Sequence, residues 1–139
     1  MMSTQLILWP MLAMVALTFT VGGVLLIRRI AYFKSAHLHP QKVATSAQMA
    51  QLVIDSRAAD NFRNLFELPV LFHAAVITIY AAQLTSPLLV AMAWGYVVAR
   101  IAHSTIHCTS NVVMQRFIAF LASCMLLAGT WLTIAYRLY

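Results

Sequence analysis

Four apolar segments dominate this chain, and each is close to the length that crosses the hydrocarbon core of a membrane. They cover about Gln5–Ile27, Asn64–Leu84, Leu88–Cys108 and Phe117–Tyr136. A transmembrane helix needs roughly 20 consecutive apolar residues. Inside a bilayer, a helix also satisfies its own backbone hydrogen bonds. We therefore expect an all-α membrane protein, with a single domain of four transmembrane helices over residues 1–139.

The composition leaves no room for a separate soluble domain. Only 9% of the 139 residues are charged, whereas soluble domains carry roughly a quarter. The net charge of +6 does not indicate a nucleic-acid partner, because the basic residues cluster beside the apolar segments as topology signals do. Cys108 and Cys124 lie in or beside expected spans and do not suggest a disulfide framework. We expect them to pack as small apolar residues and expect no metal site.

The basic residues orient the four expected spans. The second loop has no Lys or Arg and the tail has only Arg137, whereas the first and third loops together carry seven basic residues: Arg28, Arg29, Lys34, Lys42, Arg57, Arg63 and Arg116. By the positive-inside rule, the first loop (about residues 28–56) and the third loop face the cytoplasm. Both termini then lie outside it, and the compact chain suggests a bacterial inner membrane. Since Met1–Trp9 has no basic residue, we expect a retained first span rather than a cleaved signal.

Local signals predict how the second span begins and ends. A helical pattern starts at about Ser46, which we expect to be its N-cap, and should continue without a break into the second span. Pro69 then falls inside that helix and should kink it. The short turn Thr85–Pro87 predicts an antiparallel hairpin between the second and third spans.

Arg100 lies inside an apolar stretch, where a charge costs at least a few kcal/mol unless it is paired. Tyr96, His103 and His107 share its helical face. In this chain the best partner for Arg100 is Glu67, near the start of the second span. We therefore expect a Glu67–Arg100 ion pair.

A second polar face meets this one at the cytoplasmic side. Arg57, Asp60, Asn64 and Glu67 are spaced by three, four and three residues, and Arg116 opens the fourth span. Polar faces inside a membrane point toward the bundle interior or a subunit interface. Together they predict a cationic pocket suited to a small anionic and zwitterionic ligand, since arginines bind carboxylates with paired hydrogen bonds.

Each of these features also has a purely structural explanation. The arginines of the first loop and second span are ordinary interfacial anchors in many membrane proteins. The Glu67–Arg100 pair could be structural, and His73, His103 and His107 could be hydrogen-bonded core histidines. A third possibility is a haem or quinone bundle that uses two of these histidines as axial ligands.

Residues Arg57–Phe72, with the sequence RAADNFRNLFELPVLF, closely resemble the MAPEG family, the membrane-associated proteins in eicosanoid and glutathione metabolism. Ala99–His103, with the sequence ARIAH, resembles the family's third helix. The resemblance implies a homotrimer of four-helix subunits. It also implies that glutathione, as co-substrate, binds between subunits at the cytoplasmic side.

The resemblance further implies roles for individual residues. Arg116 matches the fourth-helix arginine that stabilises the glutathione thiolate, which makes it the catalytic candidate. The implied glutathione ligands are Arg28 (or Arg29), Arg57, Arg63, Asn64, Glu67, Arg100, His103 and His107. The chain departs from the family pattern at Asp60, Phe117 and Phe120, where relatives carry a basic residue, a serine and a tyrosine. These departures argue against a specialised eicosanoid activity.

Two hypotheses for the function follow. In the first, the protein is a glutathione-dependent membrane transferase or peroxidase that acts on lipophilic electrophiles entering from the bilayer. The alternative is a non-catalytic MAPEG-like subunit that binds membrane lipid or a larger membrane complex. The two differ in whether glutathione binds and becomes a thiolate.

Overall fold

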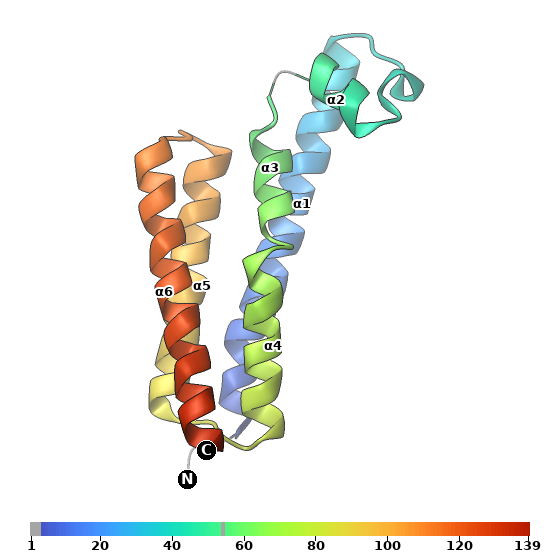
Figure 1. Cartoon of the computed structure of the whole chain (residues 1–139). Helices are drawn as coiled ribbons and strands as arrows, with labels where there is room; N and C mark the ends of the chain where they lie inside the picture. Colours follow the sequence, from blue (N-terminus) through green and yellow to red (C-terminus); the bar gives the residue numbers. More distant parts are fainter. Residues whose placement is uncertain (1–3, 54) are drawn as a thin grey trace.

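The computed structural model describes residues 4–53 and 55–139, which are helical and contain no strand (Figure 1). The elements in chain order are η1 (Thr4–Ile7), α1 (Leu8–Ser35), η2 (Pro40–Val43), α2 (Ser46–Leu52), α3 (Arg57–Asn64), α4 (Leu68–Ala81), α5 (Pro87–Cys108) and α6 (Val113–Leu138). Four segments of the described chain are long and apolar enough to cross a membrane: Thr4–Ser35, Arg57–Ala81, Pro87–Cys108 and Val113–Leu138. The expected fold class, a bundle of four membrane-spanning helices, is confirmed.

The helices form two adjacent groups (Figure 1). α1 lies beside α3 and α4, and α5 lies beside α6. α5 contacts both α1 and α3, and α6 contacts α4, so the groups close on one another. α1 begins and α6 ends at the same end of the bundle, whereas α2 and the first loop lie at the opposite end. The termini are therefore on one side, as an even number of crossings requires.

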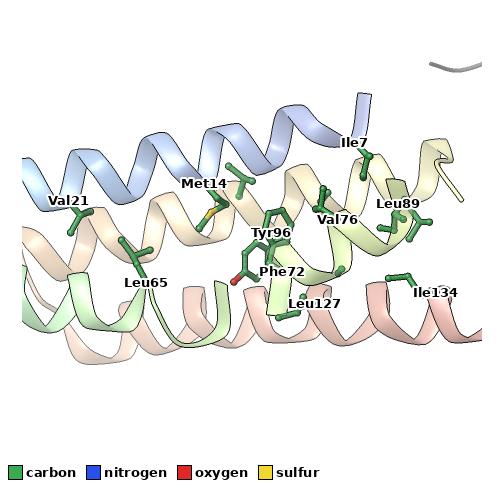
Figure 2. Close-up of a cluster of buried hydrophobic side chains, with 14 of the residues drawn as sticks. Ile7, Met14, Val21, Leu65, Phe72, Val76, Leu89, Tyr96, Leu127 and Ile134 are labelled. Atoms are coloured by element: carbon green, nitrogen blue, oxygen red, sulfur yellow. The ribbon is translucent and has the colours of Figure 1, made fainter. Parts of the chain in front are cut away.

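The core lies between the two groups (Figure 2). Its centre is the stacked pair of Phe72 on α4 and Tyr96 on α5, whose ring centroids are 4.3 Å apart. Met14 and Val76 are buried on either side of this pair, and Leu89 is buried farther toward the start of α5. Large apolar side chains also remain on the outside of the long helices, for example Phe19, Ile27, Met125 and Leu132. That apolar outer surface is what a lipid-facing bundle presents.

The expected unbroken helix from Ser46 into the second span is wrong. α2 ends at Leu52, Val53 is extended, and a new helix begins only at Arg57. The N-cap of α2 is Thr45 rather than Ser46, because Thr45 forms a capping box with Gln48. Residues Asp55 and Ser56 therefore belong to a connection between α2 and α3, where their side chains are free to contact other elements.

A second interruption divides the second span at residues 65–67. α3 ends at Asn64 and α4 begins at Leu68, with Pro69 in its first turn. Pro69 has no N–H to donate to the carbonyl of Leu65, so a continuous helix would lose that hydrogen bond. The expected kink is in fact a break, and Glu67 lies beyond the end of α3 instead of on its polar face. The third departure is at α1, which continues past Ile27 to Ser35.

Candidate functional site

Arg100 is the most deeply buried charged residue of α5, with no exposed surface. Its Nη2 donates to the side-chain oxygen of Asn64 and, at 3.2 Å, to the Asn64 carbonyl. The break after α3 makes this contact available, because the carbonyl at the end of a helix has no partner within the helix. The main partner of the buried charge is thus the C-terminal residue of α3.

The expected Glu67–Arg100 ion pair is wrong. Within the described residues no ion pair joins these two side chains, and Glu67 is exposed. Asn64 connects them instead, since its Nδ2 donates to Glu67 Oε2 at 3.1 Å while its oxygens accept from Arg100. The chain turns at residues 65–67 and carries the Glu67 carboxylate outward, where one of its oxygens accepts no hydrogen bond from the described residues.

Several buried polar atoms on the same face of α5 have no hydrogen-bond partner among the described residues. They are Arg100 Nε and Nη1, the Tyr96 hydroxyl, His103 Nε2 and His107 Nδ1. The His103 and His107 rings are 5.5 Å apart. Phe120 of α6 lies against both Arg100, at 5.9 Å, and His103, at 5.8 Å. Buried polar atoms are almost always paired, so these donors and acceptors mark a place for water or a polar ligand.

Arg116 lies in the first turn of α6, beside this face. Its Nη1 donates to Asn111 Oδ1 at 2.7 Å, and its carbonyl contacts His103 Nδ1 at 3.0 Å. Val112, the N-cap of α6, provides no side-chain cap. An uncapped helix N-terminus and a guanidinium together favour an anion at this position. His103 therefore ties the polar face of α5 to the cationic start of α6.

Arg28 and Arg57 form a different cluster, around Asp55. Arg57 binds both Asp55 oxygens, with Nε at 2.8 Å and Nη2 at 2.9 Å, and Arg28 Nη1 lies 3.6 Å from Asp55 Oδ2. Their remaining donors reach the end of α5. Arg28 donates to the carbonyl of Cys108 and Arg57 to that of Thr109, each at 2.6 Å. Cations are favourable at a helix C-terminus, so this cluster caps α5 and joins it to α1 and α3.

Asp55 lies outside the membrane-spanning segments and is the shared counter-ion of this cluster. The hydrogen bonds from Arg57, with the added charge of Arg28, lower the pKa of its carboxyl to about 2 from the ordinary value of 3.8. The carboxylate therefore remains charged throughout the physiological pH range.

Within the single chain, the expected site residues lie in two regions. Arg28, Arg57 and Arg63 line a cleft of about 1170 Å³ between the end of α1, the first loop and α3. The other expected site residues do not line that cleft: Asn64, Glu67, Arg100, His103, His107 and Arg116. α3 separates the two regions, with Arg63 on one side and the Asn64 contacts to Arg100 on the other.

The sequence reasoning missed two residues that organise this end of the bundle. Asp55 was not singled out, although its spacing from Arg57 suits a local bidentate pair. Asn61 is fully buried, donates to Cys108 Sγ at 3.3 Å and accepts from Ser104 at 3.2 Å. An asparagine one turn before Asn64 on the same helix was the available signal.

The histidines of α4 and α5 make local contacts and are not grouped with other metal-ligand side chains within the described residues. Within residues 4–53 and 55–139, no group of three or more His, Cys, Asp or Glu side chains is placed to hold a metal ion. His73 Nδ1 contacts the carbonyl of Pro69, one turn earlier, at 2.6 Å. That contact is typical of a histidine hydrogen-bonded within its own helix.

The fold and its polar face define an integral, multi-pass membrane protein of four helices with a buried cationic centre. The family model for the MAPEG family matches residues 7–136. The chain belongs to the MAPEG family, and so to the membrane proteins of glutathione and eicosanoid metabolism. Neither a curated protein nor a solved structure gave a match to this chain.

Proposed function

We propose that this protein is a glutathione-dependent membrane transferase or peroxidase that acts on lipophilic electrophiles. The observation that carries the proposal is a connected polar set. Glu67 and Asn64 lead to Arg100 of α5, and the same face of α5 carries His103, which contacts the backbone of Arg116. The set combines an exposed carboxylate, a buried guanidinium with unpaired donors, and a cation at a helix N-terminus. Family membership makes glutathione the first ligand to test.

Glutathione carries two carboxylates, one ammonium and one thiol, and this set has a complement for each kind of group. The exposed Glu67 carboxylate suits the ammonium. The unpaired nitrogens of Arg100 suit a carboxylate, because charge-assisted hydrogen bonds are the stronger ones. Arg116 then remains for the sulfur. Its guanidinium would favour the thiolate, which is the reactive nucleophile.

In the proposed reaction the glutathione thiolate attacks the electrophilic carbon of a lipophilic substrate. A carbon–sulfur bond forms and the leaving group departs with its electron pair. With a hydroperoxide, the thiolate would instead attack the terminal oxygen, so that a sulfur–oxygen bond forms, the O–O bond breaks and the alkoxide leaves with the electron pair and takes up a proton. A second glutathione would then convert the sulfenic acid into glutathione disulfide and release water. The substrate would enter from the bilayer, whose chains contact the apolar outer surface of the helices. The protein would contribute binding, orientation and electrostatic stabilisation.

We further propose that the functional unit is a homotrimer with glutathione between subunits. Glu67 and Arg63 are exposed in the single chain, so a neighbouring subunit has access to the end of α3. Arg28 and Arg57 are already bound to Asp55 and to the end of α5. We therefore assign these two arginines to holding the helices together rather than to the ligand. The first and third loops would face the cytoplasm.

A thermal-shift titration with glutathione tests this proposal. A ligand that binds only the folded state raises stability by about 2.7 kcal/mol at a hundredfold excess over Kd. We expect a concentration-dependent rise in the unfolding midpoint, and conjugation of a general soluble electrophile. Arg116→Ala should slow conjugation by at least about a hundredfold, whereas Arg137→Ala, at the far end of the same helix, should retain the wild-type rate. If glutathione neither shifts the midpoint nor is conjugated, the proposal is wrong.

One observation favours the alternative, a non-catalytic subunit that binds lipid or a larger membrane complex. The Phe120 ring lies against Arg100 and His103, where family relatives carry a tyrosine hydroxyl. Phe117 beside Arg116 is exposed and apolar. Purification with a partner in fixed stoichiometry, without any calorimetric signal for glutathione, would favour this alternative.

A further inference from the structure

A cleft of about 1170 Å³ opens at the end of the bundle where α1 leaves its apolar run. Its walls come from the end of α1, the first loop with α2, and α3. The charged residues in these walls are four arginines and two aspartates: Arg28, Arg29, Arg57, Arg63, Asp55 and Asp60. The cleft therefore has an excess of two positive charges, and its ligand should be anionic.

The four arginines of the cleft are not equivalent. Arg28 and Arg57 are bound to Asp55 and to the carbonyls at the end of α5. The guanidiniums of Arg29 and Arg63 make no hydrogen bond or ion pair within the described residues, although both line the cleft. Ten donors on two cations are thus available to a ligand, since each guanidinium has five N–H groups.

The cleft also has apolar walls and continues onto an apolar surface. Leu25, Val43 and Met49 line it. Just beside it on α1, the side chains of Leu26 and Ile27 are 59% and 69% exposed. A free anion gains nothing from such a surface, whereas the acyl chains of a lipid would cover it. The position also fits, because Arg28 and Arg29 directly follow the apolar run of α1, where a membrane–water boundary is expected.

We propose that this cleft binds the phosphate of an anionic phospholipid from the adjacent leaflet. Arg29 and Arg63 would contact the phosphate, and the acyl chains would lie along the outer face of α1. Guanidinium groups match phosphate oxygens with paired hydrogen bonds, and basic pockets between membrane helices are suited to anionic headgroups. The cleft does not include Asn64, Glu67, Arg100 or Arg116, so the lipid site is separate from the proposed glutathione site.

The test compares phosphatidylglycerol with phosphatidylcholine of the same acyl chains, titrated into the purified detergent-solubilised protein while the unfolding midpoint is followed. Phosphatidylglycerol should raise the midpoint and phosphatidylcholine should not. In the double variant R29Q/R63Q the apparent affinity should fall roughly 30-fold, because each basic residue near an anionic headgroup contributes about fivefold. R29K/R63K, which keeps the charges, should retain most of the preference. Arg137→Gln, at the other end of the bundle, is the matched control.

Three outcomes would overturn the proposal: equal stabilisation by both lipids, an undiminished preference in R29Q/R63Q, or equal stabilisation by soluble glycerol phosphate. The last would mean that a free phosphate, not a lipid, is the ligand. The unfolding midpoint of R29Q/R63Q without added lipid, compared with that of the wild type, shows that the double variant is folded. A lost lipid response is then attributed to the two removed guanidiniums.

Discussion

Arg57 and Arg100 lie on neighbouring helices at the same end of the bundle, yet they have opposite environments. Arg57 is half-exposed and uses three nitrogens, two on Asp55 and one on the carbonyl of Thr109. Arg100 is fully buried and uses one nitrogen, on Asn64, while Nε and Nη1 have no partner within the described residues. Arg57, which solvent can reach, has a protein partner for each of its three nitrogens, whereas buried Arg100 has a protein partner for only one.

This difference separates a structural arginine from a functional one. An exposed arginine that binds a carboxylate through two hydrogen bonds and a helix carbonyl through a third stabilises the native state without any ligand. A buried guanidinium with unpaired donors lowers stability unless a ligand or water completes it. The sequence alone suggested the same role for both residues. The four predictions below test the difference between them, beginning with the largest expected effect.

Replacing Arg116 by Ala should have the largest effect, because this cation supplies the electrostatic stabilisation of the thiolate. Loss of one such preorganised group lowers kcat by about 10²–10³. We expect at least a hundredfold slower conjugation of a soluble electrophile, measured at saturating glutathione. Arg137→Ala removes an arginine from the same helix and should retain the wild-type rate. Equal losses of rate in both variants would mean that a general disturbance of α6, rather than removal of the Arg116 charge, slows conjugation.

Replacing Arg100 and Arg57 by Met in separate proteins tests the comparison itself. Arg100→Met should weaken glutathione binding by roughly tenfold or more, since hydrogen bonds to charged groups contribute about 1.5–3 kcal/mol. Its free energy of unfolding should change little, because loss of the hydrogen bonds to Asn64 is offset by removal of the unpaired buried donors Nε and Nη1. Arg57→Met should do the reverse, lowering the unfolding midpoint and leaving glutathione affinity intact. Calorimetry measures the glutathione affinity of both variants, and thermal unfolding measures their stability. Equal changes in affinity and stability would contradict the distinction between a structural and a functional arginine.

Gly22 and Gly23 test whether the group formed by α1 and α3 is held by close packing as well as by arginines. A Cβ on Gly22 would lie 3.1 Å from the Phe62 ring, whereas a Cβ on Gly23 would meet nothing within 4 Å. Gly22→Leu should therefore be about 1–3 kcal/mol less stable than Gly23→Leu, the usual penalty for overpacking. Denaturant unfolding in detergent measures the difference. Equal stabilities would contradict the α1–α3 contact.

The smallest effect should come from acid titration of the Asp55 cluster. The pKa of Asp55 is about 2 in the folded protein, below the ordinary value of 3.8. A lowered pKa means that the stabilisation is fully present above about pH 4 and is lost as the pH falls toward 2. Because Asp55 is largely exposed, the loss should be small. Between pH 6 and pH 2, the unfolding midpoint of the wild type should fall more than that of Asp55→Asn. A parallel fall of the midpoint in both proteins would exclude a contribution from Asp55.

The sequence predicted the membrane-spanning class and the family, because these depend on long apolar runs and on a local motif. The interruption at residues 65–67 was only partly predictable. Pro69 predicted a distortion of the second span, but the sequence does not distinguish a kink from a break. The two differ in how neighbouring helices pack around the carbonyl of Leu65, which cannot accept a hydrogen bond from residue 69. That break is what moved Glu67 away from Arg100 and left Asn64 between them.

The division of the arginines into two groups could not be predicted from spacing. Arg57 of α3 binds Asp55 and the end of α5, whereas Arg100 of α5 binds Asn64 at the end of α3. Which arginine reaches which helix end depends on the tertiary arrangement of α1, α3 and α5. The role of Asp55 as the counter-ion of Arg28 and Arg57 similarly results from the connection after Leu52, where a continuous helix was expected.

The central claim is that the Arg116 end of this polar face binds glutathione and holds it as a thiolate. Stopped-flow measurement of thiolate absorbance in the ultraviolet, on mixing the wild-type protein with glutathione near neutral pH, tests it directly. We predict a saturable rise in absorbance that Arg116→Ala lacks and Arg137→Ala keeps. Glutathione that binds by calorimetry but gives no thiolate signal would contradict the claim.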